Sequence, residues 1–175
     1  MITIFGEEEF RPITKYGIKI PDYFISKDGR CCSTKTSKHK LLNPVYRRVE
    51  EGYKVPPKLS CQVDKSKNPE LFVDYDYSSY NYKYKGKVTS SFNRNVVIIS
   101  VKIHRAVMEA WKPIDENPPD SLKDDWDNAP ESFKQWVRDS AIIDHIDSDT
   151  SNNNIDNLRW VNSRENEFNR KKQKG

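Results

Sequence analysis

Residues 142–172 constrain the fold of this chain more than any other stretch, because their apolar and polar positions suit only one simple local structure. The apolar start of 142–145 predicts a short buried strand that ends at an acidic residue and a histidine. Residues 147–154 are polar and turn-forming, which predicts a loop. Residues 158–161 predict a second strand, so we expect two strands joined by a polar loop.

A helix is predicted to follow the second strand. Asn162 can cap its first turn, and Glu165, three residues on, completes the spacing of a capping box. Asn166, Asn169 and Arg170 then recur at spacings of three and four residues, so they share one helix face. The order strand, loop, strand, helix therefore sets a carboxylate and an imidazole opposite a helix that carries carboxamides.

This set of side chains suits phosphodiester hydrolysis. His145 is a fitting general base near neutral pH, and the oxygens of Asp144 and Asn166 are ligands that Mg²⁺ accepts, with water and phosphate completing its shell. The cation would neutralise charge that develops on the phosphate. Asp144 and His145 are strand neighbours and face opposite ways. They can serve one phosphate only if the strand is distorted or if they flank the phosphate from different sides.

Three motifs carry a resemblance to a known family. The D-H pair at 144–145 is followed by N-x-x-x-N-L-R-W-V from Asn153 and E-N-x-x-N from Glu165, which resembles the HNH (ββα-metal) endonucleases, specifically the phage homing endonucleases. I-H-R-A-V-M-E-A-W from Ile103 is similar to the helix that precedes this motif in the family. Y-F-I-S-K-D-G-R from Tyr23 is similar to the small DNA-binding module at the start of such enzymes.

The resemblance implies roles for single residues. His145 would be the general base, Asp144 and Asn166 the ligands of one Mg²⁺ or Mn²⁺ ion, and Asn157 the middle residue of the family name, which ties the loop to the base. The loop residues 147–149 read D-S-D where the family usually has D-G-N. The implied activity is hydrolysis of double-stranded DNA at a specific site, which we expect in a phage homing endonuclease.

We therefore predict an α+β fold in two parts. Residues 1–95 would form a β-rich DNA-binding module, and residues 96–175 an HNH nuclease domain with an acidic insert at 113–139. The insert has eight acidic and three basic residues, a net charge of −5, which leaves +9 on the rest of a chain whose total is +4. A basic body suits a polyanionic partner such as nucleic acid.

Double-stranded DNA is the expected partner, bound by a monomer in the cytoplasm of a phage-infected bacterium. We find no apolar run long enough for a membrane span. Three cysteines, Cys31, Cys32 and Cys61, lack metal-type spacing, so we expect free thiols and no structural zinc. The candidate DNA-binding residues are basic or carboxamide side chains near the predicted module and the last helix: Lys27, Arg30, Lys35, Lys38, Lys40, Arg159, Arg164, Asn169, Arg170, Lys171 and Lys172.

The remaining elements are predicted from shorter patterns. We expect a helix across 132–141 whose Phe133 and Trp136 dock the acidic insert on the body, away from DNA. Residues 1–12 look like a loose start. We further expect strand, turn and strand across 23–33, a strand near 53–55, a tyrosine-rich hairpin in 64–94, a buried strand at 96–101 and a helix from 103 to 111.

Two other functions stay open at this point. The chain could be a non-catalytic, sequence-specific DNA-binding protein derived from an HNH nuclease, although the intact Asp144, His145 and Asn166 favour an enzyme. An RNA-directed nuclease would need aromatic side chains presented for stacking. His104 is read as a hydrogen-bonded packing residue rather than a ligand, and Trp160 as a core residue rather than a base-stacking group.

Overall fold

The computed structural model describes residues 3–5, 8–15, 17–36, 39–44, 56–64, 66–69 and 96–172. Within these ranges the chain forms a mixed arrangement of strands and helices, as the predicted α+β class requires. Two expectations, the strand near 53–55 and most of the hairpin in 64–94, lie outside the described residues. No helix in the described parts of the chain is both long and apolar enough to cross a membrane.

The N-terminal part is a five-stranded antiparallel sheet with its strands in sequence order. The predicted strand, turn and strand across 23–33 is confirmed, with the turn between β3 and β4. The expectation of a loose start is wrong, because Thr3 to Phe5 pair with Glu8 to Phe10 and extend the sheet. The strands are β1 (Thr3–Phe5), β2 (Glu8–Lys15), β3 (Ile18–Ile25), β4 (Cys31–Ser33) and β5 (Lys40–Leu42).

A second sheet joins the two halves of the sequence. β6 (Lys58–Asp64) pairs with β7 (Val96–Lys102) along its whole length, with alternate residues of β6 buried. The strand predicted at 96–101 is therefore present, but its partner β6 was not predicted. The expected boundary at residue 95 separates these two paired strands.

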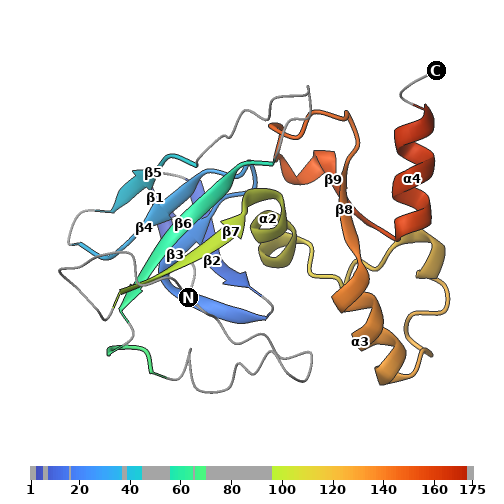
Figure 1. The fold of residues 1–175 in the computed structure, drawn as a ribbon, viewed down its shortest axis with the longest axis horizontal. Helices are drawn as coiled ribbons and strands as arrows, with labels where there is room; N and C mark the ends of the chain where they lie inside the picture. Colours follow the sequence, from blue (N-terminus) through green and yellow to red (C-terminus); the bar gives the residue numbers. More distant parts are fainter. Residues whose placement is uncertain are drawn as a thin grey trace.

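Helix α2 (Ile103–Trp111) follows β7 directly and lies at the centre of the molecule (Figure 1). It contacts β2, β3 and β7 on one side, and β8 (Ile142–His145), β9 (Leu158–Val161) and the short helix η3 (Ile155–Asn157) on the other. One cluster of buried apolar side chains runs from the sheet through α2 into the β8–β9 hairpin. The nuclease-like part thus shares its core with the N-terminal sheet.

The acidic insert packs through other residues than those predicted. Helix α3 (Glu131–Ser140) is present within one residue of its expected start and end. However, Phe133 is 38% and Trp136 is 63% exposed, so the prediction that they dock the insert is wrong. Among the buried residues of the insert are Trp126 and Val137, at 4% and 3% exposure, together with Ile114 and Pro119. Helix periodicity places two aromatic residues on one face but does not say which face meets the core.

The three cysteines are free and buried, so the expectation of free thiols is confirmed. Burial raises the pKa of Cys61 to about 12 and that of Cys32 to about 11, because the charged thiolate is poorly solvated there. These thiols are neutral at physiological pH and act as small apolar core groups.

The different burial of two tryptophans in the insert gives a direct stability test. Trp126→Ala should lower the free energy of unfolding by about 3–5 kcal/mol, because it removes a buried indole. Trp136→Ala should change it by no more than about 0.5 kcal/mol, because that side chain faces solvent. Urea unfolding followed by circular dichroism measures both, and equal losses would contradict this packing.

Candidate active site

The β8–β9 hairpin places Asp144 and His145 at the end of a strand, on opposite faces. Asp144 pairs in register with Arg159, and His145 with Leu158. The Asp144 carboxylate faces helix α4 (Ser163–Lys172), while the His145 ring faces α2. Both residues are buried, at 7% exposure. Of the two arrangements that the sequence allowed, the structure therefore has the one in which these groups lie on different sides of the strand end.

Asp144 is held by three N–H donors. Nε and Nη2 of Arg159 lie 3.0 and 2.8 Å from Oδ2, and Nδ2 of Asn169 lies 2.9 Å from the same oxygen. Because burying a polar group without hydrogen-bond partners is costly, these donors offset the cost of burying this side chain. Among the residues that the structure describes, none donates to Oδ1, which leaves that oxygen for another ligand.

His145 is oriented by Asn153, a residue to which the sequence analysis gave no role. Nε2 of His145 lies 3.2 Å from Oδ1 of Asn153. The amide of Asn153 is itself fixed, because its Nδ2 donates to the carbonyl oxygen of Ser151 at 3.1 Å. Since Oδ1 can only accept, Nε2 of His145 must carry the proton. In the neutral ring, Nδ1 is then the unprotonated nitrogen, which can act as a base.

Asn157 bonds the loop rather than the histidine ring. Its Oδ1 accepts from the backbone N of Asp147 at 3.0 Å, and its Nδ2 donates to Oδ1 of Asp147 and to the carbonyl of Asn152, both at 2.9 Å. Hydrogen bonds from Asn152, from the backbone of Asp149 and from Asn157 lower the pKa of Asp147. The two asparagines thus divide the expected role: Asn157 closes the loop, and Asn153 holds the base.

The departure of the loop from the family pattern has a structural counterpart. Ser148, where the family usually has glycine, has a φ of 67°. An L-residue in this left-handed conformation costs about 1–2 kcal/mol. The carboxylates on either side make hydrogen bonds within the loop, since Asp147 accepts from the backbone of Asp149, and Asp149 from that of Ser151. These bonds hold the turn without a glycine.

Helix α4 begins with the capping box that the sequence predicts. Oδ1 of Asn162 accepts from the backbone N of Glu165 at 2.9 Å, and Oε2 of Glu165 accepts from the backbone N of Asn162 at 2.8 Å. This fixes the start of α4 against β9. Asn166 is half-buried and lies one turn before Asn169, so the two carboxamides share the helix face toward Asp144.

The oxygens around Asp144 fit a hard divalent cation. The buried carboxylate has one oxygen without a donor among the described residues, and Asn166 and Asn169 carry carboxamide oxygens on the facing helix. The described part of the chain contains no group of three or more His, Cys, Asp or Glu side chains suited to a metal. A cation here would therefore take few protein ligands and complete its shell with water and phosphate, as Mg²⁺ does.

The candidate DNA-binding residues lie in different settings. Arg159 and Asn169 contact Asp144, and Arg30 pairs with Asp28 and Glu8. The amino group of Lys35 bonds the carbonyl of Gln62, and that of Lys27 lies 5.1 Å from the Trp111 ring centroid. Lys40 and Arg164 are exposed. Arg170, Lys171 and Lys172 lie in the last turn of α4, and Lys38 falls outside the described residues.

A cavity of about 570 Å³ lies beside the Arg159–Asp144 pair. Its walls come from β9, from α4 and from the start of the acidic insert, and they include Arg159, Phe168, Asn169 and Asp120. Asn162 at the start of α4 donates to Ser121 of the insert at 3.2 Å. The insert therefore reaches the rim of the site, although its Asp124, Asp125 and Asp127 face solvent.

Comparison with known proteins finds a family match in this part of the chain. Residues 134–168 match the family model of HNH endonucleases. The matched stretch covers about a fifth of the chain and contains the whole β8–β9 hairpin, its loop and the first half of α4. It supports an HNH nuclease unit, and with it a divalent metal and a DNA substrate. No curated protein and no solved structure matches the chain.

His104 packs edge-on against the candidate base, with ring centroids 5.4 Å apart and ring planes at 82°. It is buried, and its Nδ1 has no hydrogen-bond partner among the described residues. Burial first, and then the charges of His145, Lys102 and Arg105, lower the pKa of His104 to about 3. His104 therefore stays neutral beside His145. Trp160 is buried and donates to the carbonyl of Lys112, consistent with its reading as a core residue.

The lowered pKa of His104 predicts how the free energy of unfolding depends on pH. Below pH 6.5 the unfolded chain binds a proton at His104 that the folded chain does not, so stability should fall as the pH drops from 6.5 toward 3. Relative to a His104→Phe variant, the wild type should lose about 2 kcal/mol between pH 7.5 and pH 5. Urea unfolding of both proteins at the two pH values measures this difference. If both proteins lost the same free energy of unfolding, the pKa of His104 would not be lowered by folding.

Proposed function

We propose that this protein is a metal-dependent endonuclease that hydrolyses phosphodiester bonds of double-stranded DNA at a specific site, of the phage homing type. One observation carries the proposal. The end of β8 presents a buried carboxylate and an imidazole whose tautomer leaves Nδ1 as a base, within the stretch that matches the HNH endonucleases. The expected setting is a monomer in the cytoplasm of a phage-infected bacterium.

The roles of the residues follow from their contacts. His145 takes a proton from the attacking water at Nδ1, while Asn153 holds its Nε2–H. Asp144 and Asn166 would hold one Mg²⁺ or Mn²⁺ ion, which when bound neutralises the charge that builds up on the phosphate. Arg159, already next to Asp144, adds a positive charge at the same place. Asn157 keeps the loop closed around this end of the hairpin.

The proposed DNA face has two parts. Arg164 and the three basic residues of the last α4 turn would contact phosphates near the cut. The N-terminal sheet would supply specificity through side chains such as Lys27 and Lys40, which are exposed. Arg30 and Lys35 already have partners within the chain. They would contribute to DNA binding only by giving up those partners for phosphates.

The ion pair between Arg159 and Asp144 favours the second candidate, a non-catalytic DNA-binding protein. A guanidinium on the carboxylate competes with a metal for the same negative charge. The two candidates differ in one measurement. Incubation with plasmid DNA and Mg²⁺, with and without a chelator, should show metal-dependent cutting by an enzyme and none by a binding protein.

Removal of the candidate base should separate cutting from binding. His145→Ala should lower the single-turnover cleavage rate by about 10²–10⁴-fold, since it removes proton transfer, and leave the Kd for target DNA unchanged. Cleavage is followed on a labelled duplex, and Kd by fluorescence anisotropy without metal. A variant that still cuts near the wild-type rate would place the base elsewhere.

Loss of either proposed ligand should change the metal requirement. Asp144→Ala and Asn166→Ala should each raise the Mg²⁺ concentration for half-maximal cleavage, or abolish cleavage, because a cation with few protein ligands depends on each of them. Asn128→Ala, which removes an exposed carboxamide from the acidic insert, is the control and should keep the wild-type titration. Unchanged titrations in both ligand variants would exclude this metal site.

A further inference from the structure

The turn between β3 and β4, residues 26–30, packs against the loop that holds the candidate base. Gly29 in this turn is buried. A Cβ atom on Gly29 would lie 3.0 Å from Cβ of Asn153 and 3.1 Å from Cγ2 of Ile103. At these distances Asn153 and Ile103 would each have to move by a few tenths of an ångström to admit a side chain, so Gly29 packs closely against Asn153.

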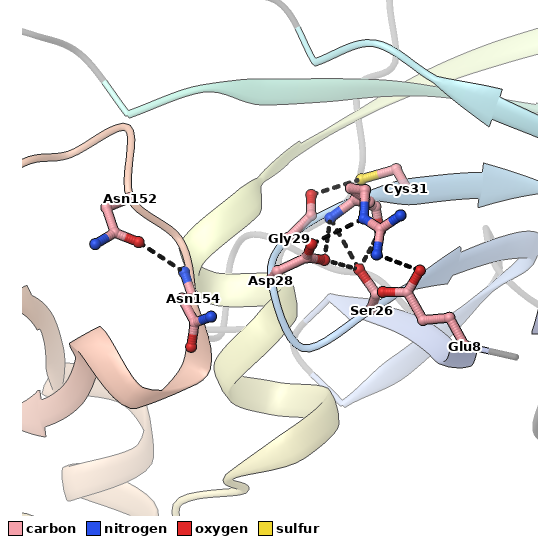
Figure 2. Close-up of polar contacts among 8 residues, drawn as sticks. Glu8, Ser26, Asp28, Gly29, Cys31, Asn152 and Asn154 are labelled. Carbon is pink, nitrogen blue, oxygen red and sulfur yellow. Dashed lines mark hydrogen bonds and ion pairs between the residues drawn. The ribbon is translucent and has the colours of Figure 1, made fainter.

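Hydrogen bonds within the turn fix this backbone, as Figure 2 shows. The buried Ser26 hydroxyl accepts from the backbone N of Arg30 at 3.0 Å, and the backbone N of Gly29 donates to the carbonyl of Ser26 at 3.2 Å. Asp28 accepts from Nε of Arg30 at 2.8 Å and from the Ser26 hydroxyl. Gly29 has a φ of 85°, the left-handed conformation that favours glycine. The backbone of the turn is therefore held in one conformation where it packs against Asn153.

The same turn holds the loop at a second point. The backbone N of Ile155 donates to the carbonyl of Lys27 at 2.8 Å. Asn153 and Ile155 are thus both fixed by the turn, one by packing and the other by a hydrogen bond. Between them, Asn154 donates its backbone N–H to Oδ1 of Asn152 at 3.3 Å, which is also drawn in Figure 2.

We infer that Gly29 is a positioning residue for the base. It fixes the position of Asn153, and Asn153 in turn fixes the orientation of the His145 imidazole. Asn153 is the residue whose Oδ1 bonds Nε2 of His145 at 3.2 Å. A displaced Asn153 would turn the ring, and a small misplacement of a reacting group can cost about 10²-fold in rate. The inference rests on the proposed nuclease function, and it makes the N-terminal sheet part of the catalytic apparatus as well as a DNA-binding module.

The chain contains a matched control for this idea. Gly17 also has a left-handed backbone, with a φ of 78°, but a Cβ atom added there would meet nothing within 4 Å. Gly17→Ala and Gly29→Ala therefore impose the same kind of backbone strain, and only Gly29→Ala adds contact with Asn153. Gly29→Asn tests the same contact with less strain, because asparagine adopts left-handed conformations more readily than alanine. It keeps the test available if Gly29→Ala folds poorly.

The experiment measures single-turnover cleavage and DNA affinity of the full chain. Gly29→Ala, or Gly29→Asn, should slow cleavage by about 10–100-fold and leave Kd within about twofold of wild type, whereas Gly17→Ala should cut at the wild-type rate. Gly29→Ala should add no further loss in an Asn153→Ala background, because both changes act on the same hydrogen bond. The inference would be overturned if Gly29→Ala changed the cleavage rate no more than Gly17→Ala does, or if its loss in rate added fully to that of Asn153→Ala.

A readout that needs no activity separates this inference from the proposed function. The ¹⁵N shifts of the His145 ring report which nitrogen carries the proton. Wild type and Gly17→Ala should share the Nε2–H signature, and Gly29→Ala and Asn153→Ala should both lose it. If the wild type does not cut DNA but shows this pattern, the proposed function fails and the positioning stands. If Gly29→Ala keeps the wild-type ring shifts, the positioning fails whatever the protein cuts.

Discussion

The burial of α2 on two sides is the constraint on which the rest of the structure depends. Ile103, Val107 and Met108 are almost fully buried, in a core shared by the N-terminal sheet and the β8–β9 hairpin. The indole of Trp111, at the end of the helix, donates to the carbonyl of Ile25, and Nζ of Lys112 donates to the carbonyl of Ile155. A hairpin of two four-residue strands has little core of its own. The geometry of the hairpin, and hence that of the site, therefore depends on its packing against α2.

Local patterns in the sequence were enough to predict the nuclease-like unit and not enough to predict the sheet around it. The strands at Ile142 and Leu158, the capping box at Asn162 and helix α4 depend on contacts between near neighbours, which a sequence shows directly. β1 was missed because it is only three residues long, and β2 because two glutamates open it and interrupt its apolar pattern; in both, pairing is set by the partner strand. For the same reason, the aromatic residues of α3 suggested packing, but only the tertiary structure reveals that Trp126 is the buried one.

The site was predictable to the level of residue types and spacing. Asp144 and His145 are adjacent at the end of a strand, as expected, and α4 brings a carboxamide to Asp144. Spacing could not tell which asparagine of 152–154 meets the imidazole, because all three lie in an irregular loop where side-chain directions follow no period. The sequence did predict a turn within 23–33, but the contact of Gly29 in this turn with Asn153 spans more than a hundred residues and has no local signal.

The pairing of Arg159 with Asp144 connects stability with chemistry. A buried carboxylate without a partner would be expensive, and here two guanidinium N–H groups and one carboxamide N–H offset that cost. All three bonds end on Oδ2, so they satisfy that oxygen without covering Oδ1. Arg159 is 41% exposed at its side chain and borders the cavity, so part of its side chain is open to solvent beside the carboxylate. The same side chain can therefore bind the carboxylate and still offer N–H groups to an anion such as a phosphate, because a guanidinium has five N–H donors.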